Sequence, residues 1–166
     1  MNTSITLHVP TEDELEYRRF LLADAATMSY NKGWSDDGTG TYHQTPEQVK
    51  QWYSYWNSEG NYYAYVKDGN GVFVGEVEIH FPEGYPLEQG VGWIGVVIQA
   101  THRRKGYGKA ALQLLTDYGF QTLGLHTLLD DIPLNRLSAI KLFEQVGFRR
   151  NEAIGVMELH RPDENR

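Results

Sequence analysis

Alternation of apolar and polar residues marks the first predicted element, a short strand at residues 5–9 that stops at Pro10. Thr11 follows, with Glu14 three residues later, in the pattern of a capping box. This pattern predicts a helix that begins at Thr11 and continues to about residue 27. The chain therefore opens with a half-buried strand and an amphipathic helix.

The next segment, residues 31–44, is rich in glycine and mixed in charge, so we expect a loop there. Its length and its aromatic residues are compatible with a lid over a substrate and equally with an idle surface loop. Thr45 and Pro46 then begin a second helix, in which Trp52 and Trp56 belong to an apolar stripe at helical spacing. We interpret this stripe mainly as part of the core.

A hairpin is predicted after this helix, because two apolar runs flank a tight turn at residues 68–71. On the returning strand a period of two separates an apolar face from a polar face. The apolar face is formed by Phe73, Val77, Ile79 and Phe81. The polar face is formed by Glu76, Glu78 and His80. This polar face is either solvated or turned towards a substrate pocket.

The rest of the chain alternates strands with helices. Strands are expected at residues 92–99 and 125–132, and helices at residues 109–119 and 135–146. A last strand is expected at residues 152–160. A helix between two parallel strands is the normal crossover connection, so the pattern predicts a mixed α/β fold.

Composition limits the possible functions. A chain of 166 residues with 40% apolar content fits a single domain, residues 1–166. The net charge of −7 argues against a general nucleic-acid binder, and the absence of cysteine excludes disulfides and thiol nucleophiles. No metal is expected, because the six histidines show no ligand spacing. Neither a signal peptide nor a membrane span is apparent, so the expected location is cytoplasmic.

A basic turn with two glycines stands out against this acidic background, between a predicted strand and a predicted helix. Orphan amides at a helix start and the positive end of the helix dipole favour an anion such as a phosphate group. Glycines let such a ligand approach the backbone. The candidate binding residues are Arg103, Arg104, Lys105, Gly106, Tyr107, Gly108 and Lys109. The structural alternative is a solvated basic helix start.

Two familiar phosphate-binding motifs compete for this turn. A Walker A loop is excluded, because Arg103 stands where that motif needs glycine and Ala110 where it needs Ser or Thr. The glycine spacing also satisfies the dinucleotide fingerprint, with Asp130 in the position of its ribose-binding acid. That fingerprint turns directly off a first strand, whereas several elements precede these glycines. A dinucleotide-binding oxidoreductase is therefore a minor alternative.

The turn resembles the acetyl-CoA motif of the GNAT superfamily of N-acetyltransferases, with an arginine followed by two glycines at Arg103, Gly106 and Gly108. A second segment resembles the later strand-to-helix motif of that superfamily. The residues that carry it are Asn135, Ser138, Gly147 and Phe148. The two motifs stand in the expected order, and together they cover roughly residues 72–148.

The resemblance implies a central mixed, mostly antiparallel sheet with a splayed parallel strand pair, flanked by about four helices. It also implies acetyl-CoA as acyl donor, bound by about residues 72–148, with Asn135 and Ser138 in the binding region. The pantetheine arm would contact backbone near Val96, Val97 and Ile98. The implied reaction is direct attack of a primary amine on the thioester.

Amine attack needs a base, because a free amine is mostly protonated near neutral pH. Glu78 is our first candidate, with Glu76, His80 and Asp131 as competitors. Many members of the resembled superfamily protonate the departing thiolate with a tyrosine on the last helix, but this chain has Phe143 there. Water or another tyrosine would then supply the proton, unless the thiolate leaves unaided.

The acceptor is left open by the sequence: a small amine, a peptide or protein N-terminus and a lysine would all suit an acidic pocket. The missing tyrosine supports a second hypothesis, a CoA-binding sensor or regulatory module without catalysis. Exposed strands and aromatic helices are compatible with a homodimer, although no residue pattern specifies the interface.

Overall fold

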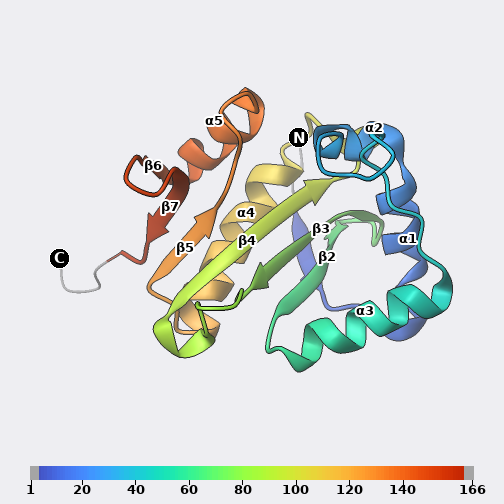
Figure 1. Ribbon diagram of the computed structural model, residues 1–166, viewed down its shortest axis with the longest axis horizontal. Coiled ribbons are helices and arrows are strands. Elements are labelled where there is room, and N and C mark those ends of the chain that lie inside the picture. The colour runs from blue at the N-terminus through green and yellow to red at the C-terminus, as the bar shows by residue number, and fades with distance from the viewer. Residues whose placement is uncertain (1–3, 163–166) are drawn as a thin grey trace.

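The computed structural model describes residues 4–162, so the expected domain of residues 1–166 extends beyond the described part at both ends. One sheet has the strand order β1-β2-β3-β4-β5-β7-β6 (Figure 1). The strands are β1 (Ile5–His8), β2 (Tyr62–Asp68), β3 (Phe73–His80), β4 (Val91–Ile98), β5 (Thr127–Asp130), β6 (Arg149–Asn151) and β7 (Val156–His160). The helices are α1 (Glu16–Ala23), α2 (Ala25–Met28), α3 (Pro46–Ser58), α4 (Tyr107–Asp117) and α5 (Leu137–Val146).

Neighbouring strands are antiparallel except for β4 and β5, which confirms the predicted mixed, mostly antiparallel sheet. The parallel contact involves only Val91 to Trp93 on β4. β4 continues to Ile98 in contact with β3, whereas β5 ends at Asp130. The two strands therefore separate beyond Trp93, and this separation is the splay of the parallel pair.

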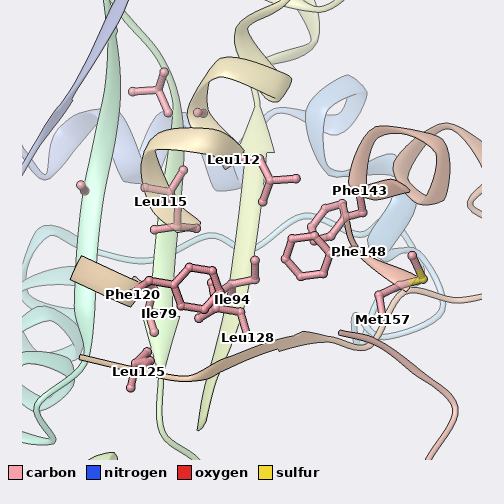
Figure 2. Packing of buried hydrophobic residues seen from close by; sticks show 14 of the residues in the cluster. Ile79, Ile94, Leu112, Leu115, Phe120, Leu125, Leu128, Phe143, Phe148 and Met157 are labelled. Carbon is pink, nitrogen blue, oxygen red and sulfur yellow. The ribbon is translucent and has the colours of Figure 1, made fainter. Parts of the chain in front are cut away.

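The larger core lies between the sheet and α4 and α5, and α4 passes behind the sheet in Figure 1. Figure 2 shows Leu112 and Leu115 of α4 close to the sheet residues Ile79 and Leu128. Phe148, which is fully buried, contacts Phe143 of α5 with ring centroids 4.9 Å apart. This layer fixes the start of α4, and with it the basic turn, against the end of β4.

A second, aromatic core covers the opposite face of β2 and β3. Tyr63 and Tyr65 of β2 point towards α1 and α3, where they pack with Leu15, Val49 and Tyr53. The hydroxyl groups of these tyrosines are not left unpaired: that of Tyr65, for example, donates to the carbonyl oxygen of Glu14 at 2.9 Å. Because α1 and α3 stand on this face, the polar face of β3 is covered by helices and is not open to solvent.

The helix predicted from Thr11 is interrupted. A short 3₁₀ turn precedes α1, and the backbone of Asp24, extended at ψ 108°, separates α1 from α2. One predicted helix is therefore two, and the described part of the chain has five helices where about four were expected. The second predicted start is confirmed, because Thr45 accepts a hydrogen bond from the amide of Gln48 at 3.1 Å.

The predicted faces of β3 are correct from Glu76 onwards but wrong at Phe73. An irregularity in the pairing of β2 with β3 matches Lys67 with Phe73 although Val66 already pairs with Gly75. The extra residue moves the ring of Phe73 to the aromatic core. A strict period of two does not register such a bulge.

The last strand, predicted at residues 152–160, begins only at Val156 as β7, and the unpredicted strand β6 precedes it. β6 pairs with β7 in antiparallel register, and a turn at residues 152–155 connects them. Gly155 in this turn has a φ of +72°, a value that glycine adopts without steric strain. β6 has only three residues, which is too short for a periodic pattern to reveal.

Candidate functional site

The basic turn presents unpaired backbone amides. Among the described non-glycine residues, Arg104 alone has a positive φ, +62°, and Gly106 follows at +85°. Within residues 4–162, no amide from Arg104 to Lys109 donates a hydrogen bond to the protein. These amides precede or begin α4, so they form a concave donor site at the positive end of a helix dipole. This is a binding site suited to phosphate oxygens.

The basic side chains of the turn are placed differently from one another. Arg104 and Lys109 line the adjoining cleft, whereas Lys105 is exposed and is not among the lining residues. Arg103 also borders the cleft, but its guanidinium donates to the carbonyl oxygens of Ile98, at 2.9 Å, and Thr27, at 2.8 Å. Arg103 therefore fastens the end of β4 to α2, a contact that the sequence did not indicate.

A cleft of about 590 Å³ extends from this turn into the splay between β4 and β5. Val96, Val97 and Ile98 line one wall, and Ser138 lines the opposite wall on α5. Asn135 is exposed and lies outside the lining residues. The cleft combines orphan amides at one end with a free strand edge along its length, which fits a long ligand that carries phosphates.

Gly108, the second glycine of the turn, is closely surrounded by other elements. A Cβ added at Gly108 would lie 3.2 Å from Cδ2 of Leu142 on α5 and 3.7 Å from Cγ1 of Ile98. The glycine thus permits close packing of α4 against α5 and β4, in addition to lining the cleft. A bulky residue at Gly108 would disturb this packing as well as any ligand.

A second, smaller pocket of about 250 Å³ opens on the other side of β4. Tyr30 and Val97 line both this pocket and the cleft, so the two spaces meet at the splayed strand. Trp52 and Trp56 form part of its wall; they are half-buried, so the expectation that this stripe is mainly core holds only in part. Tyr42, from the long loop expected at residues 31–44, also contributes to the wall.

Glu78 lies in this smaller pocket and is joined to His80. Its Oε2 is 2.7 Å from Nδ1 of His80, and its Oε1 lies 2.6 Å from the place where a Cβ on Gly95 would stand. Burial raises the pKa of the Glu78 carboxyl, although the hydrogen bond from His80 opposes this shift. Burial would lower the pKa of His80, but the hydrogen bond and charge of Glu78 raise it overall. Glu78 and His80 can therefore share one proton between the carboxylate and the imidazole.

Glu76 is buried in the same pocket and is paired with a cation. Arg18 Nη1 lies 2.8 Å from Glu76 Oε2, and the hydroxyl of Tyr63 donates to the same oxygen. The guanidinium carbon of Arg18 stands 3.6 Å from the ring centroid of Trp52. Glu76 is thus neutralised, whereas within residues 4–162 the carboxylate of Glu78 is paired with the imidazole of His80 and with no guanidinium or ammonium group.

Comparison with protein families shows to which family the chain belongs. The profile described as acetyltransferase (GNAT) domain matches residues 5–149, which is most of the chain. The chain belongs to the GNAT acetyltransferase family. As a member of it, the protein is an acetyl-CoA-dependent N-acetyltransferase, and the expected relationship is confirmed. No curated protein sequence matches this GNAT acetyltransferase.

Solved structures share the fold of this GNAT acetyltransferase. Spermidine N-acetyltransferase from Vibrio cholerae, in complex with CoA and spermine, has 19% identity and a TM-score of 0.76, over 90% of this chain and 83% of that chain. The acetyltransferase yncA from Salmonella typhimurium, with its cofactor acetyl-CoA, has 17% identity and a TM-score of 0.75, over 97% and 99%. At sequence identities this low, the structural similarity establishes a shared fold.

The carboxyl that lines the splay in this GNAT acetyltransferase belongs to Asp130 and not to the candidate base Asp131. Asp131 is exposed and does not line the cleft, whereas its neighbour Asp130 does. Burial, and next the charge of Glu78, raise the pKa of Asp130 to about 7. Successive strand residues face opposite ways, so a shift of one position decides which aspartate is enclosed.

The cleft also contains groups of this GNAT acetyltransferase that sequence reasoning missed. Phe143 lines the cleft but has no hydroxyl group. Tyr30 and Asp130 also line the cleft, and each has a group that can donate a proton. Arg136 lies with its guanidinium carbon 4.4 Å from the ring centroid of Tyr30. Tyr30 and Arg136 are 106 positions apart, and no local pattern links them.

No helix within residues 4–162 has the length and apolar character needed to cross a bilayer. Across the same residues, no group of three His, Asp or Glu side chains is arranged to hold a metal ion.

Proposed function

We propose that this GNAT acetyltransferase transfers the acetyl group of acetyl-CoA to the primary amine of a small molecule, by direct attack of the amine on the thioester. The observation that carries the proposal is the junction of the two spaces at Val97 and Tyr30. The smaller pocket, at about 250 Å³, suits a small acceptor better than a peptide or protein N-terminus. The amine substrate of spermidine N-acetyltransferase supports the same class of acceptor.

In this proposal the protein holds the donor by its backbone. The amides of residues 104–109 bind phosphate oxygens, and the free edge of β4 at Val96, Val97 and Ile98 binds the pantetheine arm. Acetyl-CoA supplies an activated thioester when bound. A backbone amide near Val97 or Ile98 polarises the carbonyl, because it is fixed in place before the reaction begins.

Glu78 removes the proton from the attacking amine. Its carboxylate lies in the smaller pocket beside Gly95, and its raised pKa makes it a stronger base than an exposed glutamate. Nδ1 of His80 is hydrogen-bonded to the carboxylate of Glu78, so His80 positions that carboxylate. His80 is itself half-buried, and the negative charge of Glu78 acts on its imidazole. Glu76 is less suited, because Arg18 and Tyr63 already satisfy its Oε2.

The test is thiol release from acetyl-CoA with a panel of amines, amino acids and short peptides, for the native chain and for Glu78→Gln. We expect one acceptor class to raise release above unstimulated hydrolysis. Glu78→Gln should lower kcat/KM about 10²–10⁴-fold, the usual contribution of a general base. The matched control is Glu83→Gln, an exposed carboxylate just after β3, which should retain full activity.

Other results would contradict parts of the proposal. Full activity in Glu78→Gln would remove Glu78 as the base and redirect the search to Asp130. If CoA raises the melting temperature but no acceptor stimulates release, the protein is a CoA-binding sensor instead of a catalyst.

The pH profile gives a second check on the base. Native kcat/KM should fall as the pH drops through the pKa of Glu78, because the protonated carboxyl accepts no proton. His80→Asn removes the hydrogen bond that lowers this pKa, so the acid limb of the profile should move to higher pH. An unshifted acid limb would show that His80 does not act on Glu78.

A further inference from the structure

The acceptor pocket contains a cation of its own. Arg18, on α1, inserts its guanidinium between Trp52 and Tyr63, with its central carbon 3.6 Å and 5.1 Å from the two ring centroids. Its Nη1 also lies 2.8 Å from Glu76 Oε2 and 3.3 Å from the hydroxyl of Tyr63. Aromatic faces beside a carboxylate are the usual site for an ammonium group. In this protein that site is filled by the protein itself.

The ion pair is enclosed rather than superficial. The side chain of Arg18 is 13% exposed and that of Glu76 is 10% exposed. The charge of Glu76, although opposed by burial, raises the pKa of the Arg18 guanidinium further above its ordinary value, so Arg18 stays charged at every practical pH. A substrate cation would have to displace a buried guanidinium that already has a carboxylate, a hydroxyl and two aromatic rings as partners.

Few charges remain to bind a substrate. Among the described residues that line the pocket, the formally charged side chains are Arg18, Glu76 and Glu78. Because Arg18 and Glu76 compensate each other, Glu78 provides the remaining negative charge. That charge faces the amine that reacts, and His80 already offsets part of it. A second ammonium on the same acceptor would meet no unpaired carboxylate there, and Arg18 would repel it.

The other walls are mainly apolar or aromatic. Leu22 and Met28 come from the N-terminal helices, Trp56 from α3 and Tyr42 from the loop before it. Such walls stabilise an uncharged hydrocarbon or aromatic body by removing it from water. Asn31 also lines the pocket, but its Nδ2 already donates to the carbonyl oxygen of Gly40 and to the hydroxyl of Tyr42. Apart from this amide and the compensated pair of Arg18 and Glu76, the pocket has one charged end, at Glu78, and a mainly apolar and aromatic wall.

We propose that the acceptor is a small monoamine with an uncharged, apolar body, and that Arg18 excludes diamines and polyamines by occupying the site that a second ammonium would need. This inference rests on the proposed acetyltransferase function and narrows its substrate class. Arg18 acts here as a specificity-determining residue.

The experiment compares two acceptors that differ by one amine: pentylamine and 1,5-diaminopentane. For the native protein, kcat/KM measured by thiol release should be at least tenfold higher for pentylamine. In Arg18→Met the aromatic site and Glu76 become available, so the ratio should shift by at least tenfold towards the diamine. Arg19→Met is the matched control: this neighbouring arginine bonds Glu16 and the carbonyl oxygen of Gln44, outside the pocket, and its loss should leave the ratio unchanged.

A second variant guards against failure of Arg18→Met to fold with Glu76 unpaired. Arg18→Met/Glu76→Gln removes both charges, so it should lose the native preference without gaining affinity for the diamine. Quenching of tryptophan fluorescence by each amine gives a readout independent of turnover, because Trp52 and Trp56 line the pocket. Native protein should respond to pentylamine at lower concentration than to the diamine.

The outcomes separate the two proposals. Equal or better use of 1,5-diaminopentane by the native protein would overturn the monoamine inference while leaving the acetyltransferase function intact. An unchanged ratio in both Arg18 variants would show that Arg18 does not determine specificity. If neither amine, nor any other amine tested, stimulates release, the proposed function fails and this inference fails with it.

Discussion

At the scale of single residues, the buried carboxyl of Asp130 has a consequence for stability. Its pKa in the folded protein is raised to about 7, above the ordinary value of 3.8, so the folded state binds its proton more tightly than the unfolded state does. The folded state is therefore disfavoured progressively as the pH rises from about 4 to 7. Above pH 7 the full penalty is present, on the order of 4 kcal/mol at about 1.36 kcal/mol per pKa unit.

We therefore expect Asp130→Asn to raise the free energy of unfolding at pH 8, by on the order of 4 kcal/mol relative to its effect at pH 4. Urea denaturation at both pH values measures this difference. Asp131→Asn is the control, because that neighbouring side chain is exposed. Its charge is a minor contributor to the raised pKa of Asp130, so this variant should change the difference between the two pH values only slightly. The same pH dependence in native protein and Asp130→Asn would show that Asp130 titrates normally.

For single residues, prediction from the sequence succeeded at some positions and failed at others. Glu78 was identified because a strict alternation places it on the polar face of its strand. Its neighbour Glu76 shares that face, but its partner Arg18 is 58 positions away, and only the folded chain brings the two together. The choice between Asp130 and Asp131 depended on one position in the register, which no periodic pattern near a strand end resolves.

At the scale of elements, the turn before α4 and the helix α2 are held together by Arg103. Its guanidinium donates to the carbonyl oxygens of Ile98 and Thr27, which lie in different parts of the chain. Sequence reasoning assigned Arg103 to ligand binding because of its place in a motif. The structure shows a contact with the protein as well, so the motif arginine shapes the turn whose amides are exposed.

Arg103→Met should therefore lower the free energy of unfolding by about 1–2 kcal/mol, since hydrogen bonds from a charged donor contribute on this order. Chemical denaturation measures the loss. Arg104→Met makes the same change of charge at the next position, where the side chain is exposed, and should have little effect on stability. Equal destabilisation by both variants would mean that charge, and not the contacts of Arg103, is responsible.

Element boundaries were predictable where local chemistry determines them. The cap at Thr45 and the end of α5 at Gly147, which has a φ of +115°, depend on residues adjacent in sequence. The break at Asp24 also has a local signal, because aspartate is a common N-cap residue and Asp24 is the N-cap residue of α2. The bulge near Phe73, in contrast, depends on the pairing of β3 with β2. Local propensity is overruled at such a point, and the sequence pattern carries no trace of it.

At the scale of the whole molecule, one sheet joins the N-terminal and C-terminal halves. β1 and β2 come from the first half, yet Ile5 and Leu7 of β1 pack against the same core as α4. The smaller pocket draws its walls mainly from the first half, and the cleft from the second. The family motifs, which begin near residue 72, indicated only the second of these.

Because the halves share a core, we expect them to unfold together. Fluorescence of Trp52 and Trp56 reports on the first half, and far-ultraviolet circular dichroism reports on all elements. The two signals should give a single, coincident transition, and CoA should shift both equally. Two separated transitions would show that the halves are independent units.

Because Glu78 and Gly95 lie in contact on neighbouring strands, substitutions at these two positions constrain each other. A side chain at position 95 would take the space that the Glu78 carboxylate now fills, and the glutamate would have to move away. The protein would still fold, but its base would no longer lie beside the splayed strand. In evolutionary terms the order of changes is constrained: a descendant of this chain gains a side chain at position 95 only after the base has been shortened or relocated to another element.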